Sequence, residues 1–387
     1  MTNHRATPFD RLVQLAQHVF APVGTNAALN WLMGTIFLVL LVFLAGLAIV
    51  QPGYSFDLVA YLGATLHHHD VGTDPMQAWE IVKQVASEDV YRDLSTANDY
   101  RVTQSTDQSA FISTLPLYSA KIGYIYWLNG LAPALGWIKA AQWSSLFFGL
   151  LFGLIALVWM IRENCLQGAA IVAAVLLATN YFDALRYASP DIIAAAATLA
   201  AIYLWTRSRE FSASGLLLIA FLFRPDTLLF AFALILSSWA FHLPKWRAVV
   251  LFVALLICSY LIRTATDHPG WWVHYYFSNV QIQNTLVGFQ PDFSLIAWAK
   301  GQARGVISAL TQFNWPILLV FILATIAATA TTKRFSRRQS AMLLACLLTI
   351  AGKFVVFPLP DDRLYMVFVV AMTLLVLQVV QPRLAWR

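Results

Sequence analysis

The sequence predicts an all-α polytopic membrane protein. Of its 387 residues, 59% are hydrophobic and only 11% are charged, against roughly 25% charged residues in an average soluble domain. Several apolar stretches, beginning with residues 27–50, approach or exceed the roughly 20 residues that a helix needs to cross the hydrocarbon layer. No ten-residue segment shows the alternation of a transmembrane β-barrel strand. The formal net charge of +6 is therefore interpreted through its distribution along the chain, and nucleic acid is not an expected partner.

About ten transmembrane helices are expected. The first 26 residues are polar or mixed, and residues 27–50 are too long for the apolar core of a signal peptide without a clear cleavage site, so the first span is expected to remain as an anchor. The expected spans are residues 27–50, 140–161, 168–185, 191–206, 212–224, 227–243, 248–263, 314–331, 339–357 and 364–381.

Lysine and arginine indicate the orientation. With the N-terminus inside, the tails and the segments after spans 2, 4, 6 and 8 hold 13 of the 25 lysines and arginines but only three of the 19 acidic residues. This is the bias of cytoplasmic loops, so both termini are expected on the cytoplasmic side of the inner (cytoplasmic) membrane. The inverted topology would place "TKRFSRR" outside and the acid-rich first loop inside, which the same rule disfavours.

Two long segments, residues 51–139 and 264–313, are expected outside the cytoplasm, within a single domain over residues 1–387. The first contains a helical pattern at 76–86 and an amphipathic, aromatic one at 116–131 that suits a helix at the membrane surface. An eleventh span that turns at "APALG" is the alternative for 116–131. The second segment has the aromatic density of an interfacial belt.

Charged residues at span ends are the first candidates for function, because they are costly near lipid unless they are paired or face water. An ion pair or a helix cap explains any one such pair taken alone. Their position on one side of the expected membrane predicts a single site built from several loops. The groups are Asp57; Asp183, Arg186 and Asp191; Arg224 and Asp226; and Asp361, Asp362 and Arg363.

This layout resembles the GT-C superfamily of membrane glycosyltransferases, which includes protein O-mannosyltransferases, aminoarabinose transferases and the catalytic subunit of oligosaccharyltransferase. The resemblance covers most of the chain in layout and identifies no subfamily. It rests on short motifs: an aromatic-Asp-x-x-x-Tyr pattern at 56–61 with Leu66 beyond it, "PLY" at 116–118, Arg162 at the end of a span, "SPD" at 189–191 and "PDDRLY" at 360–365.

The resemblance implies a transferase that moves a sugar from a polyprenyl-phosphate donor to a hydroxyl of a glycan, glycolipid or protein at the outer face of the membrane. Asp57 is the expected general base. At the C-terminal end of the first span its negative charge would oppose the helix dipole, which disfavours a purely structural role. A single displacement would invert the anomeric carbon, although Asp191 could supply the second carboxylate that a double displacement needs.

Arginine and lysine are the expected ligands of the donor phosphate. Arginine forms bidentate hydrogen bonds to phosphate and stays charged, so Arg363 and then Arg224 rank first, followed by Lys121 and Arg186. Further contacts with substrate are expected from Asp191, His69, Asp70, Tyr61, Trp271, Trp272, His274 and Asp362. Trp271 and Trp272 suit stacking on a sugar face, and an interfacial belt explains them equally well.

A metal site is not expected. The stretch "HHHD" at residues 67–70 has suitable ligand types, but three adjacent residues of regular structure cannot all point to one ion. No Asp-x-Asp pattern of the kind that holds a divalent ion in some GT-C members is present. The expectation is therefore a monophosphate donor and no cofactor, with a divalent metal as the disfavoured alternative.

A transporter or flippase of lipid-linked saccharides is the alternative function. It would share the many spans and the aromatic boundary, but transporters often show inverted repeats and ionisable residues near the midplane. The sequence shows no repeat, and its charged groups lie at one boundary. A non-catalytic scaffold would leave those groups without a purpose.

Overall fold

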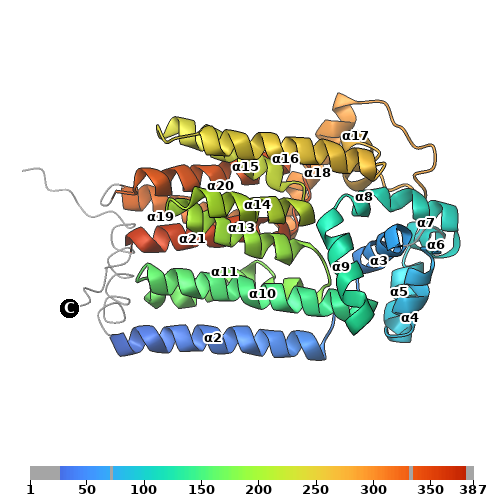
Figure 1. Ribbon diagram of the computed structural model, residues 1–387, viewed down its shortest axis with the longest axis horizontal. Coiled ribbons are helices and arrows are strands. Elements are labelled where there is room, and N and C mark those ends of the chain that lie inside the picture. Colours follow the sequence, from blue (N-terminus) through green and yellow to red (C-terminus); the bar gives the residue numbers. More distant parts are fainter. Residues whose placement is uncertain (1–26, 70–72, 331–333, 381–387) are drawn as a thin grey trace, which may run out of the picture.

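The computed structural model describes residues 27–69, 73–330 and 334–380 (Figure 1). Every named element in these ranges is a helix, and the pairing of Gly53 with Tyr187 is an isolated bridge, so the all-α prediction is confirmed. The helices form an elongated bundle with a smaller group of helices at one end. We call that group the cap and define it as α3–α9, residues 56–135.

The bundle contains the apolar helices. Exposed valines, leucines and aromatic residues cover the outer helices, as at Val39 and Phe43, which are 61% and 59% exposed, and such apolar surfaces suit lipid. The bundle helices are α2 (Ala27–Val50), α10 (Trp137–Arg162), α11 (Ala169–Ala178), α13 (Asp191–Thr206), α14 (Glu210–Phe223), α15 (Thr227–Ala240), α16 (Trp246–Ala265), α19 (Trp315–Ala330), α20 (Arg337–Val356) and α21 (Asp362–Val380).

Five helices in the described ranges are long and apolar enough to cross a membrane: α2, α10, α16, α20 and α21. A sixth candidate is the pair α18 (Leu295–Gln312) and α19, which are bent by 79° at the break between them. The expected count of about ten is not confirmed, although each expected range contains a helix. The shorter bundle helices have 10 to 16 residues, or at most about 24 Å at 1.5 Å per residue.

The expected span at 168–185 is interrupted. A short 3₁₀ turn (Leu166–Gly168) precedes α11, and α12 (Tyr181–Arg186) begins after Asn180, whose φ of 54° lies in the left-handed region. Asparagine tolerates this conformation better than most residues. After the break, α12 packs against α10 and α2.

The cap is a series of short helices, and polar side chains stabilise the N-termini of three of them. Ser87, Asn98 and Asp107 each accept a hydrogen bond from a backbone N–H in the first turn of the next helix, as N-cap residues do. The cap helices are α3 (Phe56–His69), α4 (Gln77–Lys83), α5 (Glu88–Thr96), α6 (Asp99–Thr106), α7 (Gln108–Thr114), α8 (Pro116–Ser119) and α9 (Ile122–Leu135). The expected helix at 76–86 is therefore present as α4.

The expected single helix at 116–131 is instead two helices. α8 starts with Pro116 at its first position, and Lys121 stands at the break before α9 with non-helical φ and ψ of −88° and 58°. The chain then turns at Gly136, where φ is +78°, and enters α10. At 14 residues, α9 is not among the helices that are long enough to span.

Residues 264–313 are more ordered than a loop. They contain α17 (Trp271–Tyr275), a π-helical turn (Tyr276–Val280) and α18, and the stretch between them contacts the cap. Gln104 of α6 donates to the Asn284 carbonyl at 2.9 Å, and the Leu286 N–H donates to Ser113 of α7 at 2.9 Å. This segment therefore ties the cap to the bundle.

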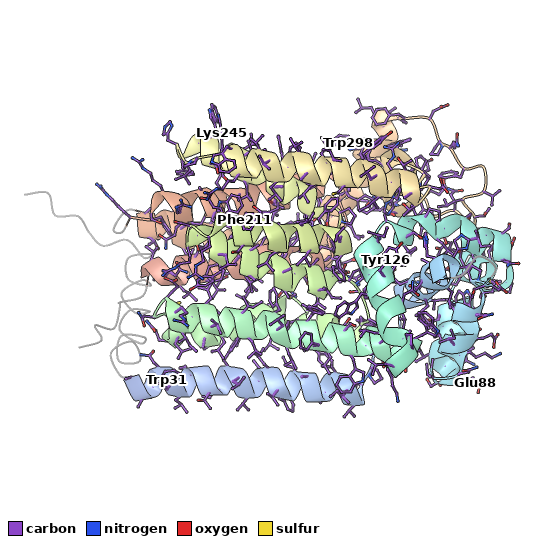
Figure 2. All side chains as sticks on the ribbon, viewed as in Figure 1. Trp31, Glu88, Tyr126, Phe211, Lys245 and Trp298 are labelled. Atoms are coloured by element: carbon purple, nitrogen blue, oxygen red, sulfur yellow. The ribbon has the colours of Figure 1, made fainter. Side chains whose placement is uncertain are left out.

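The two ends of the bundle differ in charge. Trp31 and Lys245 lie at the end away from the cap, and Glu88 lies on the cap (Figure 2). At the far end, the buried carboxylate of Glu210 accepts from Arg247 at 3.1 Å and from Arg338 at 2.8 Å. These pairs link the N-terminal ends of α14, α16 and α20 on the side where the basic segments gather.

Candidate active site at the junction of bundle and cap

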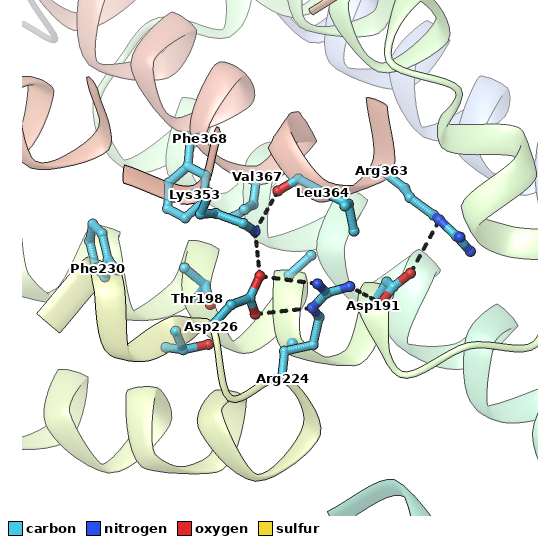
Figure 3. A pocket seen from close by; sticks show the side chains of 13 residues that line it. Asp191, Thr198, Arg224, Asp226, Phe230, Lys353, Arg363, Leu364, Val367 and Phe368 are labelled. Atoms are coloured by element: carbon cyan, nitrogen blue, oxygen red, sulfur yellow. Dashed lines mark hydrogen bonds and ion pairs between the residues drawn. The ribbon is translucent and has the colours of Figure 1, made fainter. Parts of the chain in front are cut away.

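A network of charged side chains fills the cap end of the bundle (Figure 3). It brings together the groups expected from four separate parts of the sequence, after the first span and at the ends of α13, α14 and α21. We call it the ion cluster, and it consists of Asp57, Asp191, Arg224, Asp226, Lys353, Asp361 and Arg363.

Arg363, in the first turn of α21, connects three carboxylates. Its Nε lies 2.8 Å from Asp361 and 3.3 Å from Asp191, and its Nη2 lies 3.4 Å from Asp57. Because Asp57 belongs to α3, this last contact joins the bundle to the cap. The guanidinium is therefore occupied by protein carboxylates.

Arg224, just after α14, is occupied as well. It makes a two-pronged contact with Asp226, at 3.1 and 3.0 Å, and it also pairs with Asp191. Lys353 of α20 lies 2.8 Å from Asp226 and donates to the Leu364 carbonyl at 2.9 Å. The cluster thus contains four carboxylates and three cations, and it has an excess of one negative charge.

A small cavity, with about 30 Å³ of space for water-sized molecules, lies beside the cluster, between α13, α15, α20 and α21. Charged groups of Asp191, Arg224, Asp226, Lys353 and Arg363 line one side, and two threonines together with alanine, leucine, valine and phenylalanine side chains line the rest. A space of this size holds no more than about one to three water molecules, and it exposes the charged groups of the cluster to them.

Asp57 is the most accessible carboxylate of the cluster. Its side chain is 35% exposed, against 8% for Asp191. One oxygen accepts from the Tyr118 hydroxyl at 3.3 Å and the other from Arg363 at 3.4 Å. Both contacts are long for charge-assisted hydrogen bonds, so this carboxylate is held in position but remains open to a further partner.

The structure corrects one argument about Asp57. The first span ends at Val50, and Asp57 lies in the first turn of a new helix, α3. A negative charge is favourable at a helix N-terminus, so the dipole stabilises Asp57 there. The expectation that it opposes a dipole was wrong, because the sequence does not reveal that a second helix begins at Phe56.

Lys121 lies beside the cluster without a carboxylate partner. Within the described residues its Nζ donates to the Leu117 carbonyl at 2.9 Å and forms no ion pair, while the Tyr61 and Tyr118 ring centroids are 5.6 and 5.2 Å away. Burial, and then the positive charge of Arg224, lower the pKa of Lys121 to about 8, although nearby carboxylates including Asp57 oppose this.

Two tyrosines line the space between Asp57 and Lys121. Tyr61 packs edge-on against Tyr118 and Tyr124, with ring centroids 5.2 and 5.1 Å apart. Burial raises the pKa values of both Tyr61 and Tyr118 well above the usual value, and nearby aspartates add to the effect. Tyr118 therefore stays protonated and serves as a hydrogen-bond donor to Asp57.

The aromatic residues of α17 form the side of the site that comes from the second segment. The His274 ring packs against the Phe357 ring with their planes tilted by 59° and their centroids 4.8 Å apart. Burial, together with the charges of Lys121, His268 and Arg224, holds its pKa well below the usual value, so His274 is neutral at pH 7. The indole N–H groups of Trp271 and Trp272 donate to the backbone carbonyls of Val356 and Asp292. These hydrogen bonds give both tryptophans a structural role.

Three residues of the expected charged groups, Asp183, Arg186 and Asp362, lie outside the ion cluster. Arg186 pairs with Asp183 at 2.8 Å and donates to the Tyr187 hydroxyl at 3.2 Å. Asp362 is completely buried, and it accepts from Asn180 and from the backbone N–H groups of Asn314 and Trp315, all within 3.0 Å. It therefore fixes the start of α19, and a structural role accounts for all of its contacts.

His69 is the last residue of α3, but its side chain and the whole of Asp70 lie outside the described residues. Elsewhere in the described ranges, no group of three histidine, cysteine, aspartate or glutamate side chains is arranged to hold a metal ion.

No protein-family model, no curated protein and no solved structure matches this chain.

Proposed function

We propose that the protein is a glycosyltransferase of the GT-C type that moves a sugar from a polyprenyl-phosphate donor to a hydroxyl of a glycan, glycolipid or protein acceptor. The observation that carries the proposal is the position of Asp57. It is an accessible carboxylate, oriented by Tyr118, near Lys121, a cation that forms no ion pair within the described residues, and it lies at the junction between an apolar bundle and a polar cap. A lipid-linked sugar presents its headgroup at such a boundary.

In the proposed reaction, the acceptor oxygen attacks the anomeric carbon while Asp57 takes the hydroxyl proton. The bond between the anomeric carbon and the phosphate oxygen breaks, and the electron pair leaves with the polyprenyl phosphate. A positive group near that oxygen stabilises the developing charge. One displacement inverts the anomeric configuration. Asp191 is an unsuitable nucleophile, because it is 8% exposed and pairs with both Arg224 and Arg363.

The ion pairs in the structure change the ranking of the candidate residues for the donor phosphate. Arg363 and Arg224 are neutralised by aspartates, whereas Lys121 has N–H donors without a carboxylate partner in the described chain. We assign the donor phosphate to Lys121, and we assign to the two arginines the task of holding Asp57 and the cavity wall in place. Tyr61 and His274, which both lie near Lys121, are proposed to contact the sugar.

The cap is proposed to face the extracytoplasmic side of the inner membrane, with both termini in the cytoplasm. This is supported by the basic segments at the end away from the cap and by the positive-inside rule. Ten crossings are proposed, with α11, α13–α15 and α19 entering the bilayer beside the five longer helices. The polyprenyl chain would then stay in the hydrocarbon while its headgroup reaches Asp57.

Transport of a lipid-linked saccharide is the alternative, and the charged wall of the cavity between α13 and α21 is the observation that favours it. Product analysis separates the two functions. A transporter moves the donor without breaking its glycosidic bond, whereas a transferase releases polyprenyl phosphate.

The pKa of Lys121 predicts the pH dependence of donor use. Below about pH 8 the ammonium is charged and binds phosphate, and above it the neutral amine does not, so kcat/KM for the donor should fall about tenfold per pH unit above that value. Lys121→Arg should abolish this alkaline fall, because a guanidinium stays charged. The measurement is kcat/KM between pH 6.5 and 9.5 for both proteins, and an identical alkaline fall in the variant would contradict the assignment.

A further inference from the structure

A second cation without an ion-pair partner lies in the cap. Arg101 belongs to α6, and its guanidinium carbon lies 4.0 Å from the Phe56 ring centroid and 6.0 Å from that of Tyr100. Its Nη1 atom is buried and has no hydrogen-bond partner. In the described ranges its side chain forms no ion pair.

This arrangement is costly for a purely structural arginine. The side chain is partly buried, and its cation–π contact with Phe56 only partly compensates for the water that the buried Nη1 atom has lost. An arginine that only packs its aliphatic stem against apolar surface keeps its charged head in water. Burial lowers the pKa of Arg101, although Asp57 and Asp93 oppose the shift, and a guanidinium remains charged at neutral pH.

Arg101 lies next to the proposed reaction site. Its stacking partner, Phe56, directly precedes Asp57, and its positive charge lowers the pKa of Tyr118, the residue that donates to Asp57. It approaches Asp57 from the cap helices, whereas Arg363 approaches from the bundle. The Asp57 carboxylate therefore pairs with Arg363 of the bundle and interacts electrostatically with Arg101 of the cap, which forms no ion pair in the described ranges.

We propose that Arg101 binds an oxyanion, a phosphate or carboxylate group carried by the acceptor. The inference rests on the proposed function and narrows it to an acidic acceptor. Lys121, at the break between α8 and α9, binds the phosphate of the donor, and Arg101, on α6, holds the acidic group of the acceptor. The two cations thereby position both substrates around Asp57.

The test uses inorganic phosphate as the probe and the full chain in nanodiscs of neutral lipid. A ligand that binds only the folded state raises the thermal unfolding midpoint. The experiment is carried out on Lys121→Gln protein, which removes the proposed donor-phosphate contact. Phosphate should still raise the midpoint, and adding Arg101→Gln should weaken the apparent affinity at least tenfold. Adding Arg92→Gln, on the neighbouring helix α5, is the matched control and should change nothing, because Arg92 is exposed and paired with Asp89.

A second arm identifies the source of the oxyanion. In nanodiscs with anionic lipid, a lipid-borne phosphate that fills the site should suppress the response to added phosphate, whereas a site for a water-soluble group should respond as it does in neutral lipid. The inference is overturned if Arg101→Gln leaves phosphate binding unchanged, or if Lys121→Gln alone abolishes it. Because no donor and no turnover are involved, this result is independent of whether the chain transfers sugar.

Discussion

Asp57→Asn should lower the rate of sugar transfer by about 10²- to 10⁴-fold, the range that general-base catalysis contributes. Asparagine has nearly the same shape and can still accept a hydrogen bond from Tyr118, but it cannot take up the proton of the acceptor hydroxyl. The donor KM should change little, because the phosphate is assigned to Lys121. The measurement is the initial rate of polyprenyl phosphate release with purified wild-type and variant protein.

Asp89→Asn is the matched control for this experiment. Asp89 lies on α5 of the same cap, is highly exposed and pairs with Arg92, so its replacement should leave the rate unchanged. Equal unfolding midpoints for the three proteins would show that the fold is intact. An Asp57→Asn protein that keeps more than about a tenth of the wild-type rate would rule out Asp57 as the general base.

Arg224→Met should destabilise the protein by about 3 to 5 kcal/mol, the effect of removing one partner of a buried ion pair. Arg224 pairs with both Asp191 and Asp226, and its loss leaves two carboxylates at the cavity wall with one cationic partner each. The measurement is the free energy of unfolding in a denaturing detergent titration.

Two further variants test the cause of this loss. Arg186→Met removes an arginine from the partly exposed pair with Asp183, so it should cost about 0 to 1 kcal/mol. In Arg224→Met/Asp226→Leu, the two losses should be less than additive, since contacting residues are coupled. Strict additivity, or equal losses for the Arg224 and Arg186 variants, would mean that the cluster does not stabilise the bundle in this way.

Much of the fold was predictable because hydrophobic length is a strong signal. Each expected span contains a helix, and α13 has the expected bounds. The number of membrane crossings was harder to predict. The helices α13–α15 are apolar, but they are shorter than the length that a membrane span needs. The helix α18 was missed, since Lys300, Gln302 and Arg304 interrupt its hydropathy.

The convergence of the charged loops was also predictable, from their position at alternate span ends, and ion pairs such as Arg363 with Asp57 confirm it. The roles of the residues remain predictions. Lys353 was missed, although a lone lysine in an apolar run is a signal for function or pairing. Arg101 had no such signal, because its burial against Phe56 follows from the packing of cap helices that no local pattern reveals.

The most direct test of the account follows both parts of the donor. Purified full chain is incubated with a synthetic polyprenyl phosphate that carries a radiolabelled sugar, together with cell-envelope extract as the source of acceptor. The account predicts that one polyprenyl phosphate is released for each labelled sugar that enters the acceptor, and that Asp57→Asn abolishes both signals. A donor that stays intact, or that crosses the bilayer of a proteoliposome with its glycosidic bond unbroken, would contradict it.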